Sequence, residues 1–413
     1  MNTYLVGGAV RDKMLGLLVI DRDWVVVGST PDDMRVAGYK SVGKDFPVFL
    51  HPQTHEEYAL ARKERKVGPG YHGFDFDTGA SVTLEEDLSR RDLTINAMAM
   101  SDSDELVDPF NGQEDLKQRL LRHVSPAFVE DPVRVLRVAR FMARLAPLGF
   151  KVADETMILM RSMVDNGEIG NLVAERVWQE LEGALKASSP RAFIETLRAC
   201  DALSIILPEL DKLFGVPQPA QWHPEIDSGI HTLMVLDQAT KLSDTVDVRL
   251  AALLHDLGKG VTPEAEWPSH RHHDVRGADI IEVVAARLRI PKRLRDLSVL
   301  TARYHLRVHE ALNLKPATLV KLMQALDVIR KPERYEHFLL ACEADSRGRL
   351  GLEDRPLPEL AFLREAADVF RKVDSAAIAA NTENKAEIPE ALRLARITAI
   401  RQWRKLREEG QVT

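Results

Sequence analysis

Residues 4–28 read YLVGGAVRDKMLGLLVIDRDWVVVG, and this stretch decides the fold of the first part of the chain. A short apolar run ends in Gly7 and Gly8, and a second apolar run follows Asp21 and Asp23. The pattern predicts two buried strands, with a strand-to-helix turn at the glycines. Because successive side chains of a strand alternate between faces, Asp21 and Asp23 are expected to be buried on the same face.

Two buried carboxylates on one face repel each other unless a positive charge lies between them. Mg²⁺ takes oxygen ligands and is commonly held by one or two carboxylates together with substrate phosphates. The backbone at Gly7 and Gly8 could approach a phosphate, and Arg11, one turn into the next helix, could reach the same anion. Either motif alone is usually a plain turn, but their order within one βα unit indicates a nucleotide site.

The composition is that of a globular protein. A chain of 413 residues is too long for one ordinary core, so two to four packed units are expected. The net charge of −7 argues against non-specific coating of nucleic acid, although a local basic face could still bind RNA. No apolar run is long enough to cross a bilayer, and a strand-like run follows Met1 at once, so we expect a cytoplasmic protein. The two cysteines, Cys200 and Cys342, are expected to be free and buried.

The predicted secondary structure changes along the chain. The first hundred or so residues predict mixed α/β structure, with strands in VFLHP and EEYALAR, and helical periodicity begins near Leu116. A proline-rich segment, 214–227, is the best linker candidate, and a histidine-rich helical block follows it. The expected domains are a head (1–115), a helical neck (116–215), a second helical domain (228–329) and a helical tail (330–413).

Two further motifs carry arginines. RRDLTINAMA, residues 90–99, predicts the start of a helix, where Arg91 could bind a phosphate. Asp92 could accept a hydrogen bond from a ribose hydroxyl, cap the helix, or do both. EDPVRVLRVARFMAR, residues 130–144, predicts an amphipathic helix with four arginines in one stripe, for which a solvated basic edge is the usual explanation.

In this order, LVGGAVRD, DRDW, RRDLTINAMA and EDPVRVLRVARF resemble the bacterial CCA-adding enzymes, the class II tRNA nucleotidyltransferases of the DNA polymerase β-like superfamily. The resemblance runs through the whole chain. It implies an α/β nucleotidyltransferase head, a mixed sheet with helices, followed by all-α neck, HD and tail regions. It also implies template-independent addition of the tRNA 3′-terminal CCA from CTP and ATP, with Asp21 and Asp23 as catalytic residues that hold Mg²⁺.

By the same resemblance, Asp131 and Arg134 form an amino-acid template that hydrogen-bonds the Watson–Crick edge of CTP or ATP. An acceptor-only carboxylate beside a donor-only guanidinium can match cytosine and adenine but not uracil. A third carboxylate is typical of the superfamily; Glu57 is the candidate, with an ordinary exposed strand residue as the alternative. The expected nucleotide-binding residues are Gly8, Arg11, Arg91, Asp92, Asp131, Arg134, Arg137 and Arg140.

The tRNA is expected on a basic face that includes ARKERK, residues 61–66, and the helical tail. In the resembling family a mobile loop takes part in the switch from C to A addition, and KVGPGYHG, residues 66–73, has a suitable composition. An ordinary exposed charge run is the alternative for both segments.

SGIHTLMVL and LAALLHDLGKG bring His231 and the pair His255–Asp256 into helical segments, and further histidines follow in SHRHHD and RYHLRVHE. A lone buried histidine is usually structural, but this series resembles the HD superfamily of metal-dependent phosphohydrolases. The resemblance assigns His231, His255 and Asp256 to a metal site, with Asp345 as a weaker candidate and residues 270–273 as a possible surface loop. Imidazole ligands favour a transition metal such as Ni²⁺ over Mg²⁺.

In some CCA-adding enzymes the HD domain hydrolyses 2′,3′-cyclic phosphates and terminal 2′-phosphates, which would repair damaged tRNA ends. The alternative is a relic HD fold that only packs. Rival functions for the chain are a poly(A) polymerase, an RNA-binding protein with an inactive head, and an enzyme whose main activity is the HD site. The expected partners are tRNA, CTP and ATP, without a membrane, for a monomer or weak homodimer.

Overall fold

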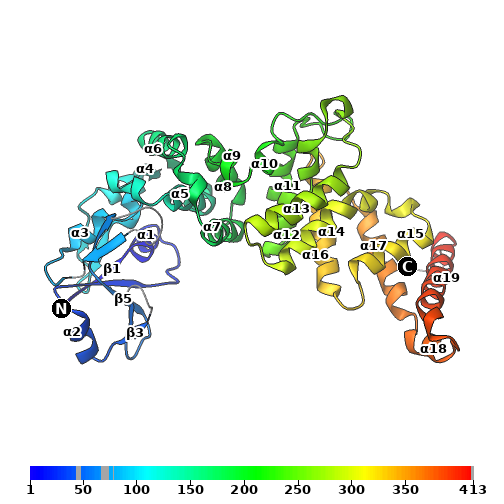
Figure 1. The fold of residues 1–413 in the computed structure, drawn as a ribbon, viewed down its shortest axis with the longest axis horizontal. Coiled ribbons are helices and arrows are strands. Elements are labelled where there is room, and N and C mark those ends of the chain that lie inside the picture. The colour runs from blue at the N-terminus through cyan, green and yellow to red at the C-terminus, as the bar shows by residue number, and fades with distance from the viewer. Residues whose placement is uncertain (43–47, 67–73, 78, 411–413) are drawn as a thin grey trace. The chain divides into compact units, whose positions relative to one another are not determined.

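The computed structural model describes residues 1–42, 48–66, 74–77 and 79–410; of residues 64–66 and 74–77 only the backbone is described. The chain divides into two compact units, Met1–Ile206 and Leu207–Thr413, each with its own dense set of internal contacts. Figure 1 shows a sheet with helices in the first unit and helices in the second. The predicted fold class, a mixed α/β head followed by helical regions, is therefore confirmed.

A seven-stranded sheet forms the centre of the first unit, in the order β3-β4-β5-β2-β1-β8-β9. β2 pairs antiparallel with β1 and parallel with β5, so the sheet is mixed. The strands predicted from YLVGGAV, WVVVG, VFLHP and EEYALAR correspond to β1, β2, β4 and β5. The sheet comprises β1 (Asn2–Val6), β2 (Asp23–Val27), β3 (Lys40–Val42), β4 (Val48–Leu50), β5 (Glu57–Leu60), β8 (Ala99–Ser101) and β9 (Leu106–Val107).

The two faces of β2 pack against different cores. Val25 belongs to a cluster with Val6 and Leu88, whereas the next residue, Val26, packs with Phe49 on the opposite face. Asp23 shares its face with Val25, because the two positions are two residues apart. The core thus determines the side of the sheet on which the Asp23 carboxylate lies.

The prediction that Asp21 and Asp23 are both buried within a strand is wrong. β2 begins at Asp23, Asp21 precedes the strand, and both side chains are exposed. The reason is their place at the end of the sheet: the apolar residues that the core covers start only after Asp23. The pair therefore lies at the open end of the strand, where a ligand can reach it.

The helices of the first unit follow and flank the sheet. Two short pairs of strands accompany them, the antiparallel β6 (Lys63–Lys66) and β7 (Phe74–Asp77) and the parallel β10 (Leu120–Leu121) and β11 (Lys151–Val152). The helices are α1 (Gly8–Met14), α2 (Pro31–Val36), α3 (Leu84–Ser89), α4 (Gly112–Gln118), α5 (Val133–Leu145), α6 (Asp154–Asp165), α7 (Ala174–Lys186), α8 (Pro190–Ala199) and α9 (Leu203–Ile206).

RRDLTINAMA does not start a helix, contrary to the prediction. The segment passes from the end of α3 through a short 3₁₀ turn, η1 (Thr94–Asn96), into strand β8. The Asp92 carboxylate accepts hydrogen bonds from the backbone N–H of Leu93 and the side chain of Asn96, which closes a tight turn. The apolar residues that follow then pair with β1 instead of continuing a helix.

The second unit is helical throughout its described part, apart from loops and short 3₁₀ turns such as η5 (Leu257–Val261). One apolar cluster contains residues from α11 to α19, among them Val235, Phe338 and Trp403. The regions predicted as 228–329 and 330–413 therefore share a core. The helices are α10 (Pro208–Asp211), α11 (Ser228–Leu242), α12 (Val246–Leu254), α13 (His273–Arg287), α14 (Lys292–His309), α15 (Pro316–Leu326), α16 (Pro332–Arg347), α17 (Pro358–Lys372), α18 (Ser375–Ala380) and α19 (Ile388–Glu408).

The proline-rich segment 214–227 lies within the second compact unit, which begins at Leu207. Within the segment Gln218 is buried, and its side-chain oxygen accepts a hydrogen bond from Lys259. The prolines therefore shape a loop that packs inside the second unit.

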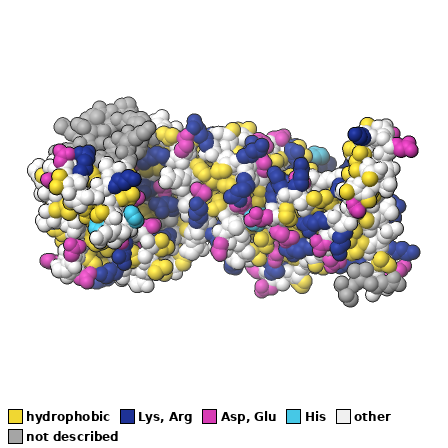
Figure 2. All heavy atoms as spheres, turned by 90° about the horizontal axis from the view of Figure 1, so that it is seen from below, with side chains coloured by type: hydrophobic (Ala, Val, Ile, Leu, Met, Phe, Trp, Pro, Cys, Tyr) yellow, Lys and Arg dark blue, Asp and Glu magenta, His cyan; other side chains and the backbone are white. Residues whose placement is uncertain are grey.

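Charged side chains of both signs are mixed on the face of the molecule drawn in Figure 2. On the face drawn in Figure 2, Lys and Arg side chains alternate with Asp and Glu and do not form a single basic field. Among the described residues, no helix is both long and apolar enough to cross a membrane.

Candidate nucleotide pocket and metal centre

The turn between β1 and α1 is built on Gly7. Its φ is +69°, and a Cβ at this position would lie 2.9 Å from Nη1 of Arg91. The positive φ therefore favours glycine here, whereas the guanidinium is the end of a flexible side chain and could shift. One turn later, the buried Arg11 donates hydrogen bonds to Asp12 (2.9 Å) and to the side-chain oxygen of Asn96 (2.6 Å).

A pocket of about 430 Å³ opens beside this turn. Seven arginines and three aspartates line it, so positive charge predominates, which suits a polyanion such as a triphosphate. All of its residues belong to the first unit. They are Gly7, Gly8, Arg11, Asp23, Arg62, Arg90, Arg91, Asp92, Asn96, Asp131, Arg134, Arg137, Phe141 and Arg176.

Asp23 lies at the wall of this pocket. Although the side chain is exposed, the pocket wall partly removes water from the carboxylate and raises the pKa of Asp23 above its usual value; the Arg91 guanidinium opposes this shift and the charge of Asp21 adds to it. Glu57 is the register partner of Asp23 on the parallel strand β5, so the two side chains leave the sheet on the same face. Asp21, Asp23 and Glu57 thus place exposed carboxylates near one end of two adjacent strands, and carboxylate oxygens are the type of ligand that Mg²⁺ takes.

Asp92 is held by Arg137 at the pocket wall, with Nη2 of Arg137 2.7 Å from Oδ2 of Asp92. Burial alone would raise the pKa of Asp92, but the Arg137 guanidinium and hydrogen bonds from Asn96 and Leu93 lower it to about 2. The carboxylate is therefore a permanent acceptor that already has a cationic partner. Arg91 donates to Asp87 (3.2 Å), which orients the guanidinium beside Gly7.

Asp131 lies in the pocket with a partner that the sequence did not suggest. Its two oxygens accept hydrogen bonds from Nη1 (3.1 Å) and Nη2 (2.7 Å) of Arg176 on α7. Arg134 donates instead to the backbone carbonyls of Ala127 and Arg90. Asp131 and Arg134 both line the pocket.

Arg140 was expected to line the nucleotide pocket and is not among its lining residues. Its guanidinium hydrogen-bonds Glu180 on α7, and Gly183 leaves room for the arginine stem, since a Cβ there would lie 2.6 Å from Cδ of Arg140. Arg140 therefore fastens α5 to α7. Arg176 is one of the pocket residues that the sequence did not suggest; it lies in the run AERVWQELEGALKA, where helical periodicity is the dominant sequence pattern.

The basic run ARKERK is divided by the fold. Arg62 lines the pocket, whereas Lys63 forms an ion pair with Glu86 (2.6 Å). The side chains of Arg65 and Lys66, and the glycine-rich run that follows them to residue 73, lie outside the described part of the chain.

The second unit gathers the HD residues into one buried cluster. His231 comes from α11, His255 and Asp256 from the end of α12, and Asp345 from α16. Nε2 of His231 lies 3.2 Å from Oδ1 of Asp345, and Nε2 of His255 lies 3.2 Å from Oδ2 of Asp256 and 3.7 Å from Oδ1 of Asp345. Asp345, the weaker candidate from sequence, is therefore placed with the other three. The HD cluster continues past residue 329.

The ring nitrogens of His231 and His255 that face away from the cluster have hydrogen-bond partners. Nδ1 of His231 lies 2.9 Å from a Glu225 oxygen, and Nδ1 of His255 lies 2.7 Å from the carbonyl oxygen of Ala252. Such bonds fix the tautomer and leave Nε2 with a lone pair for a metal. Two imidazoles and two carboxylates suit a transition metal. Glu225, in the proline-rich segment, is an orienting residue that sequence reasoning missed.

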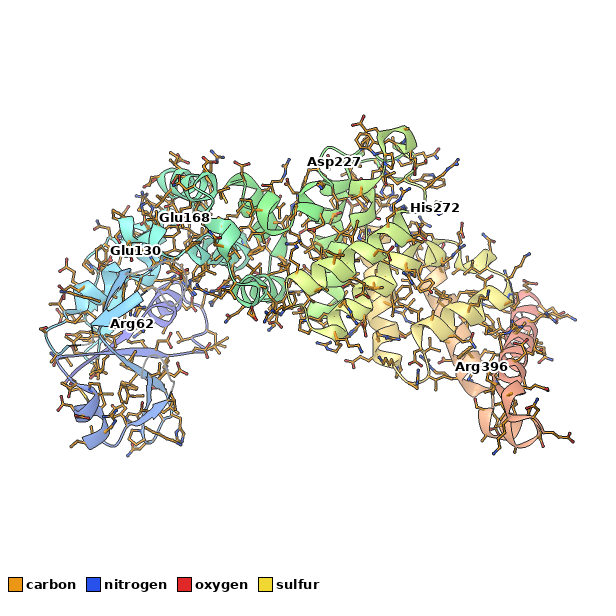
Figure 3. All side chains as sticks on the ribbon, viewed as in Figure 1. Arg62, Glu130, Glu168, Asp227, His272 and Arg396 are labelled. Atoms are coloured by element: carbon orange, nitrogen blue, oxygen red, sulfur yellow. The ribbon has the colours of Figure 1, made fainter. Side chains whose placement is uncertain are left out.

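The histidines of SHRHHD have different environments, so they are not one surface loop. His270 is buried and its Nε2 lies 2.7 Å from the carbonyl oxygen of Pro217. His273 is buried at the start of α13, whereas His272 is exposed at the edge of the unit (Figure 3). Asp227, also labelled in Figure 3, caps α11 by accepting from the backbone N–H of Ile230, and this places His231 one turn into the helix.

Comparison with known proteins finds three matching family models. Residues 3–122 match the family model "Poly A polymerase head domain", residues 149–214 "Probable RNA and SrmB-binding site of polymerase A", and residues 229–371 "HD domain". The Multifunctional CCA protein of Thioalkalivibrio sulfidiphilus is 58% identical over 402 residues, which cover 97% of this chain and 98% of the relative. The chain belongs to the family of bacterial CCA-adding enzymes that carry an HD domain.

A second relative and two solved structures are also similar to this chain. The Multifunctional CCA protein of Alkalilimnicola ehrlichii is 56% identical over 400 residues, with 97% of each chain covered. A Thermotoga maritima CCA-adding enzyme, solved with tRNA, shares the fold with a TM-score of 0.61 at 20% identity, over 97% of this chain and 87% of that one. A CCA-adding enzyme solved with ATP gives a TM-score of 0.65 at 21% identity, over 98% and 89% of the two chains.

Proposed function

We propose that this chain adds and repairs the 3′-terminal CCA of tRNA with CTP and ATP, and that its HD cluster is a metal-dependent phosphohydrolase. The observation that carries the first activity is the pocket. It joins an acidic strand end to seven arginines within one unit. Relatives named multifunctional CCA proteins, and neighbouring structures solved with tRNA, CTP and ATP, support this assignment.

The chemistry assigned to the acidic end is nucleotidyl transfer. Asp21 and Asp23, with Glu57 beside them, would hold Mg²⁺, which when bound assists attack by the primer 3′-hydroxyl and departure of pyrophosphate. Arg11 and Arg91 are positioned at the Gly7–Gly8 turn to bind phosphate oxygens. Because the pocket contains fixed guanidinium groups, little reorganisation is needed when the triphosphate enters.

Nucleotide selection is assigned to the opposite wall. Asp131 can accept from the exocyclic amino group that cytosine and adenine share, and Arg134 and Arg137 supply donors. Arg176 holds the Asp131 carboxylate by two parallel hydrogen bonds, so its oxygens have a defined direction. Asp92 would accept from the ribose 2′-hydroxyl, which distinguishes ribonucleotides from deoxyribonucleotides.

The activity assigned to the HD cluster is hydrolysis of 2′,3′-cyclic phosphates and of terminal 2′-phosphates and other phosphomonoesters. His231, His255, Asp256 and Asp345 would hold a transition metal such as Ni²⁺, which when bound activates water for attack on phosphorus. The buried Lys259, whose Nζ lies 2.6 Å from Oδ2 of Asp256, adds a positive charge for the phosphoryl group. A cytoplasmic location and a monomer or weak homodimer complete the proposal.

The first experiment uses a tRNA transcript that ends at the discriminator base, offered CTP alone, ATP alone, and both in Mg²⁺. Two residues added from CTP and a third only when ATP is present support CCA addition. A long ladder from ATP alone would indicate a poly(A) polymerase. No extension by a folded protein would contradict the proposal for the head and leave the HD cluster as the main activity.

A further inference from the structure

The aromatic ring of Phe141 is surrounded by three guanidinium groups of the first unit. Cζ of Arg140 lies 4.9 Å from the centroid of the ring, Cζ of Arg11 5.3 Å and Cζ of Arg137 5.7 Å. Arg137, Arg140 and the ring belong to α5, whereas Arg11 belongs to α1. All three distances fall within the range, up to about 6 Å, over which the face of an aromatic ring attracts a cation.

The three arginines share a second feature, because each of them donates a hydrogen bond to a different carboxylate. The pairs are Arg11–Asp12, Arg137–Asp92 and Arg140–Glu180. A carboxylate on one side and the ring on the other leave each guanidinium few alternative positions. The ring of Phe141 is therefore a contact that three separate ion pairs have in common.

This group of side chains forms part of the nucleotide pocket. Arg11, Arg137 and Phe141 line the pocket, and Arg140 does not. Phe141 is 6% exposed and Arg11 2%, so water has little access to the contact between them. Exclusion of water strengthens the attraction between a cation and an aromatic face. Arg140, although outside the pocket lining, is linked to the pocket through the ring.

A buried phenylalanine on an amphipathic helix is usually an apolar core residue. At position 141 an aliphatic side chain could fill the same space, but it would offer no attraction to three positive charges. Such charges repel one another at short range, and the negative face of an aromatic ring offsets part of that repulsion. The surroundings of Phe141 therefore favour an aromatic residue over other apolar residues.

We propose that Phe141 is a positioning residue for the incoming nucleotide and acts through the arginines around its ring. Arg11 is assigned above to the phosphate oxygens and Arg137 to the wall that selects the base. One ring would thus set the positions of groups at both ends of the nucleotide. CTP and ATP should depend on it equally. The inference rests on the proposed nucleotide addition and adds to it a residue that makes no hydrogen bond through its side chain.

The test weakens the negative face of the ring and leaves its shape almost unchanged. Phe141 of the full chain is replaced, by site-specific incorporation, with monofluoro, difluoro and trifluoro phenylalanine, and the Kd for CTP is measured by equilibrium dialysis in Mg²⁺. Fluorine withdraws electrons from the ring, so we expect the Kd to rise by about twofold with each fluorine. A Kd that does not depend on the number of fluorines would overturn the proposal, because a packing role alone predicts that result.

The matched position is Phe193 on α8, which is buried like Phe141 and does not line the pocket. The same analogues at this position should leave the Kd for CTP unchanged. An equal rise at both positions would overturn the proposal, since it would show that fluorination acts through the stability of the unit.

Phe141→Leu provides a second measurement. It should raise the KM for CTP and for ATP by about tenfold each and keep kcat within about threefold, because the metal-binding carboxylates are not changed. A change in KM for one nucleotide only would contradict a role shared by both. If the variant unfolds, as judged by circular dichroism, the fluorinated series decides alone. Extension of a tRNA transcript by wild type is run in parallel: no extension would refute nucleotide addition, whereas a flat fluorine series in a protein that extends tRNA would refute the role of the ring alone.

Discussion

Glu57 is the residue whose role depends most directly on register. It is paired with Asp23 across parallel strands, which brings a third carboxylate to the end of the sheet without any motif in the sequence to mark it. Glu56, one position earlier, makes structural contacts instead, because it accepts from Nε1 of Trp24 (3.1 Å) and lies 3.6 Å from Nη1 of Arg22. Two adjacent glutamates thus make a natural comparison.

Glu57→Gln should lower the rate of CTP addition at saturating Mg²⁺ by roughly a hundredfold. If Glu57 is an anionic metal ligand, its loss weakens the stabilisation of the transition state by a few kcal/mol. Glu56→Gln should change the rate by less than about threefold, since its contacts are structural. Single-turnover extension of a tRNA transcript measures both. Near-normal turnover of Glu57→Gln would remove Glu57 from the site.

Arg176→Lys should relax the choice of base. A lysine can place only one point charge on Asp131, whereas the arginine fork directs both of its oxygens. We expect discrimination against UTP to fall by about tenfold while the protein remains folded. Arg161→Lys is the control, because Arg161 donates to the carbonyl of Ala199 and does not line the pocket. Equal CTP-to-UTP ratios in wild type and Arg176→Lys would contradict the assignment.

At the scale of elements, the pair Asp92–Arg137 ties the η1 turn to helix α5. The pKa of Asp92 is lowered to about 2 from 3.8, so the carboxylate is ionised more readily in the folded protein than in the unfolded chain. This stabilisation, about 2 kcal/mol, is fully present above pH 4 and is lost as the pH falls from 4 towards 2.

Asp92→Asn should therefore destabilise the first unit at pH 7 by about 2 kcal/mol, and the difference from wild type should shrink as the pH approaches 3. Hydrogen exchange of peptides from α5 and β8 measures this locally, so unfolding of the second unit does not interfere. A difference that stays constant from pH 7 to pH 3 would show that the pair does not stabilise the unit through charge.

How far the sequence predicts the structure depends on the range of the interactions. β1, β2 and α5 follow from local apolar patterns, whereas His231, His255 and Asp256 were assigned by the resemblance to the HD superfamily. The failed predictions involve tertiary contacts. Asp131 and Arg176 are 45 positions apart, and nothing local indicates that they pair. RRDLTINAMA has a helix-like pattern, but pairing of β8 with β1 outweighs that preference. Exposure of Asp23 depends on where its neighbours in the sheet end.

At the scale of the whole molecule, the two candidate sites share no residue. Every lining residue of the nucleotide pocket belongs to Met1–Ile206, and every residue of the HD cluster to Leu207–Thr413. Each unit has apolar clusters of its own. One chain can therefore carry two activities whose residues do not overlap.

Single substitutions should separate the activities. Asp23→Asn should abolish nucleotide addition and leave hydrolysis of a cyclic nucleotide within about twofold of wild type, and His255→Asn should do the reverse. Both assays are run on the same preparations, and Ni²⁺ and Mg²⁺ are supplied separately. Loss of both activities in either variant, with normal circular dichroism, would show that the two sites are coupled.

The carbonyl that orients His255 belongs to Ala252, three residues before the ring and within the same helical segment. Fraying of that helical turn would release the ring, so this ligand is ordered only while the helix is intact. By mass action, an ion that binds only the folded unit stabilises it by about 2.7 kcal/mol at a hundredfold excess over its Kd. The lifetime of this protein against cellular proteases would then follow the supply of free transition metal.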